Sequence, residues 1–261
     1  MAIRSLPHKV DRDHMQQSFA FCLKNLEEFP SERDEQLKKK NPRFFILCID
    51  SGLDAMNLAY FLGKDLSKVV NYFRGALPEV KVALDLGYEF DGQEFRRLLL
   101  STIAVNHKKA IELLCAIGVD AYRHPDVEMS DCPYAITEAI QAAASGKMKT
   151  FKVKIAEAQA LLNPKRLIID RRKEEAEFKP LIALLRAIAD KDQAALEEAW
   201  KSRAQYWKKE YGKKSESANY DGILDRELLG IARIAEQYGL TAPGSNPYAP
   251  IELLRVAEDM K

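Results

Sequence analysis

The chain has 261 residues, of which 47% are hydrophobic and 30% charged, a composition typical of globular rather than disordered proteins. Forty lysines and arginines against 39 aspartates and glutamates give a net charge of +1, which argues against a dedicated nucleic-acid-binding protein because such proteins usually carry a strongly basic domain. The first residues have no apolar signal core and no stretch approaches about 18 consecutive apolar residues, so we expect a cytoplasmic protein that does not span a membrane.

The N-terminal third is expected to contain four helices. The first covers about 8–28 and ends at Pro30. The second starts at Asn41-Pro42, because a proline at the first helical position lacks only a donor that would stay unpaired, and it ends at Gly63, a residue suited to a C-terminal cap. The run Phe44–Ile49 alone would also fit a buried strand, but the apolar residues continue to Leu62. The remaining two helices are expected at about 65–76 and 78–88.

The middle of the chain continues the helical pattern. Asp91 and Glu94 have capping-box spacing at the start of a helix whose buried stripe holds Leu98, Leu99 and Ile103. The next helix ends at Gly118. A polar loop, Val119–Asp131, is the longest break, and helices resume at about 132–146, 148–162 and 166–178.

Apolar periodicity is clearest in the C-terminal third. Pro180 is expected to open a helix, and Asp190 with Gln193 has the capping-box spacing for the next one. That next helix carries an apolar stripe of Leu196, Trp200, Ala204, Trp207 and Tyr211, which predicts that both tryptophans are buried. A further helix from Leu224 to Tyr238 is expected to turn four charged residues outward: Asp225, Arg226, Arg233 and Glu236. A last short helix starts at Pro250.

These patterns predict an all-α fold of packed helical hairpins that forms one globular domain over residues 1–261. A division into an N-terminal helical half (1–118) and a C-terminal helical half (132–261), packed together, also fits the pattern. The four cysteines form no CxxC pair, so we expect reduced thiols and neither a disulfide framework nor a zinc site.

No constellation in the sequence points to catalysis. The chain has no HExxH motif, no G-x-S-x-G elbow and no glycine-rich phosphate loop, so we expect no enzyme, no catalytic residues, no cofactor and no metal ligands. His124-Pro125-Asp126 matches the tripeptide with which J domains engage their partner ATPase. The preceding helix is mostly apolar where a J domain needs a basic one, which favours a chance match.

Two features are candidates for contact with a partner protein. Residues Lys147–Lys173 hold nine basic side chains against two acidic ones, which fits either a solvated helix face or a surface complementary to an acidic partner. The loop Val119–Asp131 combines tyrosine and arginine, the residue types of binding hot spots, although a plain connecting loop explains it equally well. The candidate partner-binding residues are Tyr122, Arg123, His124, Asp126, Glu128, Lys147, Lys149 and Lys152.

The C-terminal segment of about 80 residues resembles family 49 of the immunity proteins that bacteria make against their own polymorphic toxins. The similar segments are Leu184–Asp192, the helix with Trp200 and Tyr206-Trp207, Ile223–Ala235, Gly239-Leu240 and Tyr248–Leu254. They consist mostly of packing residues. Upstream of them only the helical layout is similar.

The resemblance implies an all-α protein that binds a cognate toxin domain and blocks its action by stoichiometric occlusion, with no catalytic residues. The expected partner is therefore a toxin protein acting in the cytosol, and neither nucleic acid nor a membrane. Two alternatives stay open: a non-catalytic helical scaffold or adaptor with a concave peptide groove, and an all-α enzyme whose site is dispersed in sequence.

Overall fold

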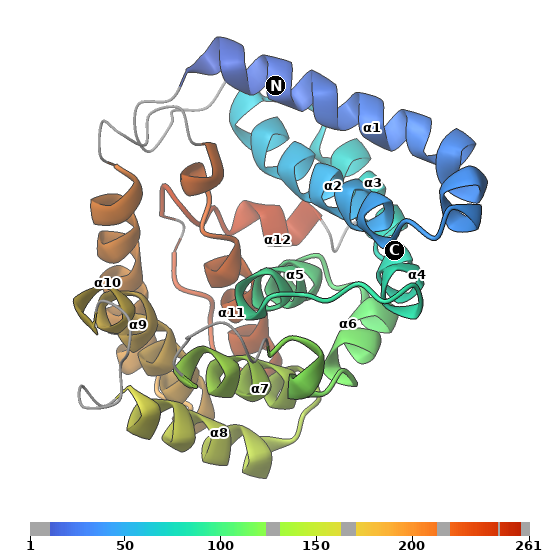
Figure 1. Cartoon of the computed structure of the whole chain (residues 1–261). Coiled ribbons are helices and arrows are strands. Elements are labelled where there is room, and N and C mark those ends of the chain that lie inside the picture. The colour runs from blue at the N-terminus through green and yellow to red at the C-terminus, as the bar shows by residue number, and fades with distance from the viewer. Residues whose placement is uncertain (1–10, 124–130, 163–170, 213–219, 245, 257–261) are drawn as a thin grey trace.

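Every regular element in the described part of the chain is a helix (Figure 1). The computed structural model describes residues 11–123, 131–162, 171–212, 220–244 and 246–256. These ranges contain no strand, and their one β-bridge joins Asn246 and Ala249. This confirms the predicted all-α class. The α-helices are α1 (Arg12–Lys38), α2 (Pro42–Leu62), α3 (Leu66–Ala76), α4 (Glu79–Asp85), α5 (Gly92–Ala104), α6 (Lys108–Cys115), α7 (Cys132–Ala144), α8 (Met148–Leu161), α9 (Arg171–Asp190), α10 (Gln193–Tyr211), α11 (Arg226–Gln237) and α12 (Glu252–Val256).

Helix α2 is the central core helix of the N-terminal part. It begins at Pro42 and ends at Gly63, whose φ of 65° is the left-handed conformation that favours glycine, as predicted. By length and hydropathy α2 could cross a membrane, but 83% of its apolar window is buried against α1, α3 and α4. Its apolar surface is therefore used in packing within this protein.

Two prolines that were expected to mark helix boundaries lie inside helices. Helix α1 continues through Pro30 to Lys38, and α9 runs unbroken through Pro180. Each proline removes one intrahelical hydrogen bond, but packing of the rest of the helix against its neighbours outweighs that loss. The predicted boundaries at Pro30 and Pro180 are therefore wrong.

Most caps follow the sequence, with one correction. Asp91 accepts hydrogen bonds from the backbone N–H groups of Gln93 and Glu94 and so begins α5. Helix α10 is capped by Asp192, which accepts from Ala195 N at 3.0 Å, and not by Asp190. The Gln193 side chain instead exchanges two hydrogen bonds with the backbone of Thr241, which ties the start of α10 to the segment after α11.

Helices α5 and α11 pack directly against each other in the middle of the molecule (Figure 1), with α1 and α2 on one side and α7 and α8 on the opposite side. Their close approach depends on Gly230: a Cβ atom added there would lie 2.3 Å from the carbonyl oxygen of Leu100. Trp200 and Trp207 of α10 are both buried, as the apolar stripe predicts. This packing sets the positions of the polar side chains that α5, α10 and α11 carry.

Candidate functional site

The predicted loop contacts are only partly on the surface. The expectation that Tyr122 is exposed is wrong: its side chain is 1% exposed, its ring stacks on Phe95 with centroids 4.3 Å apart, and its hydroxyl donates to Gln141 Oε1 at 3.3 Å. Arg123 is exposed and forms an ion pair with Asp131. Stacking on a core phenylalanine explains why Tyr122 turns inward.

The other predicted contacts divide between described and undescribed residues. His124, Asp126 and Glu128, and with them the His-Pro-Asp tripeptide, lie outside the described residues. Lys147, Lys149 and Lys152, at the start of α8, are exposed, and Lys152 Nζ lies 3.5 Å from Asp190 Oδ1. These three lysines therefore lie on the surface, apart from the buried charges described next.

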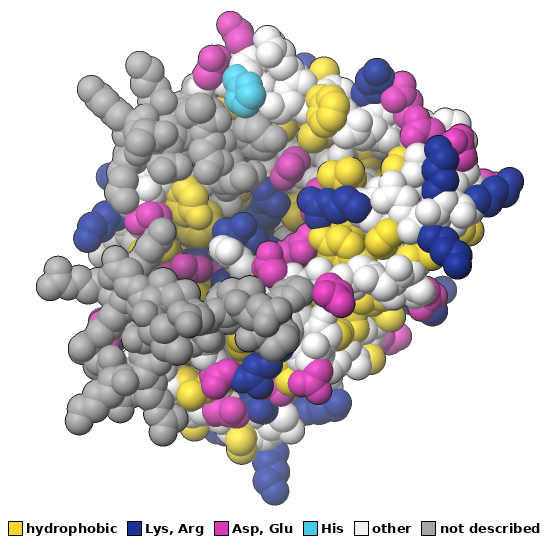
Figure 2. All heavy atoms as spheres, in the orientation of Figure 1, with side chains coloured by type: hydrophobic (Ala, Val, Ile, Leu, Met, Phe, Trp, Pro, Cys, Tyr) yellow, Lys and Arg dark blue, Asp and Glu magenta, His cyan; other side chains and the backbone are white. Residues whose placement is uncertain are grey.

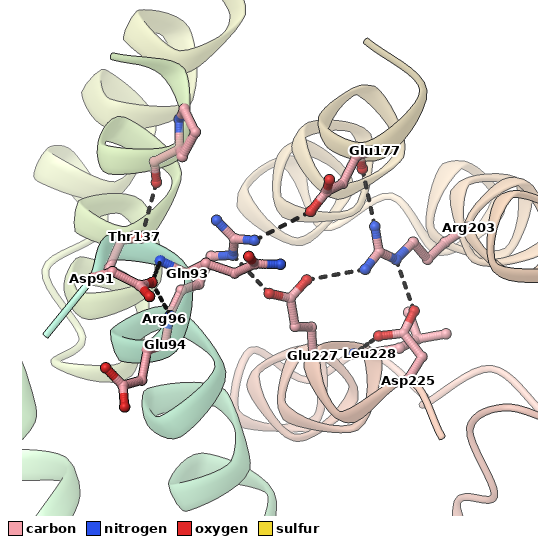
Figure 3. Close-up of polar contacts among 11 residues, drawn as sticks. Asp91, Gln93, Glu94, Arg96, Thr137, Glu177, Arg203, Asp225, Glu227 and Leu228 are labelled. Atoms are coloured by element: carbon pink, nitrogen blue, oxygen red, sulfur yellow. Dashed lines mark hydrogen bonds and ion pairs between the residues drawn. The ribbon is translucent and has the colours of Figure 1, made fainter. Parts of the chain in front are cut away.

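A network of buried charges joins α5, α9, α10 and α11 (Figure 3). Arg96 Nε donates to Glu227 Oε1 at 2.7 Å, and its Nη2 lies 3.5 Å from Glu177 Oε1. Arg203 donates to Asp225 Oδ2 at 2.7 Å, to Glu227 Oε2 at 3.0 Å and to the backbone oxygen of Glu177 at 3.0 Å. Both arginine side chains are 1% exposed. We call these five residues the buried network.

Pairing offsets the cost of burying charge most fully for Glu227 and Arg203. Burial alone would raise the pKa of Glu227, but the guanidinium groups of Arg96 and Arg203 outweigh it, so that this pKa lies below its ordinary value. Burial would lower the pKa of Arg203, but the carboxylates of Asp225 and Glu227 more than offset this and raise it. At Asp225 burial outweighs the attraction of Arg203, so that the pKa of this carboxyl lies above its ordinary value. The network is therefore a set of directly paired charges whose geometry depends on every member.

The sequence pattern placed two charged residues, one in α11 and one at its cap, on the wrong side of that helix. Asp225 and Arg233 were expected to face outward, but both are buried: Asp225 caps α11 and binds Arg203, and Arg233 donates to the backbone oxygen of Leu254 at 2.7 Å. Arg203 could have been found from its spacing, because it follows Trp200 by three residues and therefore lies on the buried side of α10.

A polar cleft adjoins the buried network. It consists of two hollows of about 550 Å³ and 220 Å³, which share Asp50, Arg97 and Arg226 in their linings and lie between α2, the start of α5, and α10 and α11. Figure 2 shows acidic and basic side chains interleaved over this face of the molecule. The charged residues that line what we call the polar cleft are the arginines Arg43, Arg97 and Arg226 and the acids Asp50, Asp54, Glu89, Asp91, Glu94 and Glu227.

Two of the three arginines are already bound to partners within the cleft. Arg226 Nη2 donates to Asp54 Oδ1 at 2.9 Å, and the Asn57 amide, with its oxygen turned toward Arg226, accepts from Nε at 2.6 Å and from Nη2 at 2.9 Å. Arg43 Nη1 donates to Tyr88 Oη at 2.5 Å and lies 3.4 Å from Glu94 Oε1. Both guanidinium groups are thereby held against the cleft wall.

Asp50 is left incompletely compensated. Among the described residues its one ion pair is with Arg43, at 4.0 Å, the same guanidinium that binds Glu94. Partial burial, reinforced by the charges of Glu94 and Asp54, raises the pKa of Asp50 to about 6. Arg43 and Arg226 offset only part of this rise. The cleft thus holds a carboxylate whose charge is unfavourable in the protein on its own.

Arg97 is the third arginine of the cleft. It is half-buried, and no described residue forms an ion pair or hydrogen bond with its guanidinium group. It also borders a further hollow of about 300 Å³ whose lining includes Arg203 and Glu177, so the polar cleft extends to the edge of the buried network.

The sequence comparisons identify the family. The model of the family described as Immunity protein 49 matches residues 98–253. The chain belongs to this family. Comparison with curated proteins found no match, and comparison with solved structures found none either. The resemblance seen in the C-terminal segment is thereby confirmed and extends upstream to α5.

The Immunity protein 49 match covers the two regions unequally. Glu177, Arg203, Asp225 and Glu227 of the buried network lie within the matched residues, and Arg96 lies two residues before them. In the polar cleft, by contrast, the wall formed by α2 lies wholly outside the match. The matched part therefore contains most of the network but only the side of the cleft that α10 and α11 form, together with Leu98 of α5.

A third kind of surface is a groove of about 780 Å³ between α9 and α10. Its lining is rich in small residues, among them Ala183, Ala187 and Ala199, with Tyr206 and Lys209 toward one end.

The described residues of this Immunity protein 49 chain contain no cluster of three or more histidines, cysteines, aspartates or glutamates that could hold a metal ion.

Proposed function

We propose that this protein is an immunity protein that binds a cognate toxin domain acting in the cytosol and neutralises it by stoichiometric occlusion. Membership of the Immunity protein 49 family carries this proposal. A protein that acts by occlusion needs a rigid surface rather than reactive groups, and the helices around the buried network supply a rigid body of this kind.

The polar cleft supports the proposal more strongly than the basic side of α8. Tight inhibitors bury on the order of 1,600 Å² in total and depend on a few central anchors in pockets. The cleft offers a recess with an incompletely compensated carboxylate, Asp50, and with Arg97, whose guanidinium group has no hydrogen-bond partner among the described residues. Lys147, Lys149 and Lys152, with Arg123, remain a second proposed contact surface, made of exposed basic residues.

A titration tests the proposed function. The cognate toxin domain is assayed for activity with increasing amounts of the protein. We expect activity to fall linearly to zero near one protein per toxin. Loss of activity at a hundredth of that ratio would instead reveal an enzyme that inactivates the toxin.

The groove between α9 and α10 is the observation that favours an adaptor as the second candidate function, because a scaffold needs a concave surface for peptides. A pull-down from native lysate separates the two functions. Recovery of one small partner encoded next to the gene supports the immunity function, whereas recovery of many unrelated partners supports an adaptor.

A further inference from the structure

We propose that the polar cleft is the toxin-recognition site and that it receives a cationic side chain, an arginine or lysine of the toxin, on Asp50. This inference rests on the proposed function and adds to it the location of the contact and the charge of the partner group.

The balance of charge in the cleft favours a cation. Six carboxylates and three guanidinium groups line its two hollows, but Glu227 is already bound by Arg96 and Arg203 of the buried network. The five remaining acids are Asp50, Asp54, Glu89, Asp91 and Glu94, and the bases are Arg43, Arg97 and Arg226. An arriving guanidinium or ammonium group therefore meets a net negative recess.

Asp50 is more weakly paired than the neighbouring acids Asp54 and Glu94. Asp54 is held by Arg226, and Glu94 accepts a hydrogen bond from the Tyr88 hydroxyl at 2.7 Å. Among the described residues the one cation that forms an ion pair with Asp50 is Arg43, at 4.0 Å. A cation from a partner would complete this pairing without displacing either of the existing hydrogen-bonded groups.

The recess also has the shape and the walls for a long basic side chain. The larger hollow has a volume of about 550 Å³, and Tyr88 lines it near Asp50. Trp207 and Tyr211 line the adjoining hollow. Aromatic faces attract guanidinium groups, and the Tyr88 and Trp207 rings already hold Arg43 and Arg203 in this way at 5.9 Å and 4.9 Å. The walls of the cleft are therefore of a kind that basic side chains contact in this protein.

Titration of Asp50 gives the site a signature that a purely structural role would not produce. In the protein alone this carboxyl has a pKa of about 6, and a bound cation must lower it. The charged and titratable groups that face Asp50 are Arg43 and Asp54 on α2, Tyr88 before α5, Glu94 and Arg97 on α5, and Arg226 on α11. Binding should therefore release a proton below pH 7, and affinity should fall about tenfold from pH 7 to pH 5.

The test is the dissociation constant of the complex with the cognate toxin domain, measured by calorimetry at pH 5 and pH 7. We expect Asp50→Asn to weaken binding about tenfold or more at pH 7 and to remove the part of the pH dependence that Asp50 causes. Asp34→Asn, on α1, is the matched control: its side chain is 87% exposed and lies outside the cleft lining, so binding should be unchanged.

Arg97→Gln removes a positive charge from the same cleft and tests whether the bound side chain is cationic or anionic. If a cation binds on Asp50, this variant should bind as tightly as the wild type or more tightly. Weaker binding by Arg97→Gln together with normal binding by Asp50→Asn would show an anionic occupant and overturn the inference. Normal, equally pH-dependent binding by Asp50→Asn would place the contact elsewhere while leaving the proposed function standing. Failure of the wild type to bind the toxin would overturn both.

Discussion

The buried network and the polar cleft are made from the same residue types on some of the same helices, yet their charges are used differently. In the network each carboxylate is bound by a guanidinium group at 3.5 Å or less, and Arg96 and Arg203 are out of contact with solvent. In the cleft Asp50 lies 4.0 Å from a shared arginine, and no described residue pairs with Arg97. Compensated charges hold helices together, whereas uncompensated charges are open to a partner.

The largest effect is expected from breaking the network. Arg203→Met leaves Asp225 and Glu227 buried with one cation fewer, so the free energy of unfolding should fall by about 3–5 kcal/mol in a denaturant titration. Arg186→Met, on the exposed side of α9, should change it by less than about 0.5 kcal/mol.

A second substitution sharpens this test. Adding Asp225→Asn to Arg203→Met removes one of the carboxylates left without a partner, so part of the lost stability should return. If the two losses simply added, the charges would not be coupled, and the network would not be the structural element described here.

A smaller loss is expected where α5 meets α11, the contact on which both regions depend. Gly230→Ala places a Cβ atom against the Leu100 carbonyl and forces the helices apart, which should lower the free energy of unfolding by about 1–3 kcal/mol. Gly118→Ala is the control, because nothing lies within 4 Å of its added Cβ. Equal thermal midpoints for the two variants would contradict the close approach.

The smallest effect has the opposite sign. Because the pKa of Asp50 in the folded protein is about 6, above that of an exposed aspartate, ionised Asp50 destabilises the fold at neutral pH. Asp50→Asn should therefore raise the free energy of unfolding at pH 7, by no more than about 1 kcal/mol because water screens a side chain that is 41% exposed.

The same substitution has a predicted pH dependence. In the wild type, protonated Asp50 contributes its full stability below about pH 4, and this contribution is lost as the pH rises through about 6. The difference in free energy of unfolding between Asp50→Asn and the wild type should therefore shrink toward zero below about pH 4. An advantage that stayed constant from pH 4 to pH 7 would mean that Asp50 is not the titrating group.

Local signals in the sequence predicted the helices well and the charged regions poorly. The starts of α2 and α5 depend on Pro42 and Asp91, whose effects act within one turn. Pro30 and Pro180 led to wrong helix boundaries, because packing over the whole helix outweighs one lost hydrogen bond. Packing of this kind is not visible in a local sequence pattern.

Long-range pairing explains what the sequence did not reveal. Arg96 and Glu227 are 131 residues apart, and nothing near either residue indicates the other. Hydrophobic periodicity assigns charged residues to the surface, so Asp225 and Arg233 were placed outward although distant partners hold them inside. The cleft was missed for the same reason: its walls come from α2, α5, α10 and α11.

Hydrogen exchange of the protein alone and in complex with the toxin domain that the proposed function requires tests most directly whether the cleft, rather than α8, contacts the partner. Residues 86–91, which lie between α4 and α5 and line the cleft from Tyr88 onward, should exchange more slowly in the complex. Residues 147–152 at the start of α8 should change less. Protection confined to residues 147–152, with unaltered exchange over 86–91, would contradict the assignment of recognition to the polar cleft.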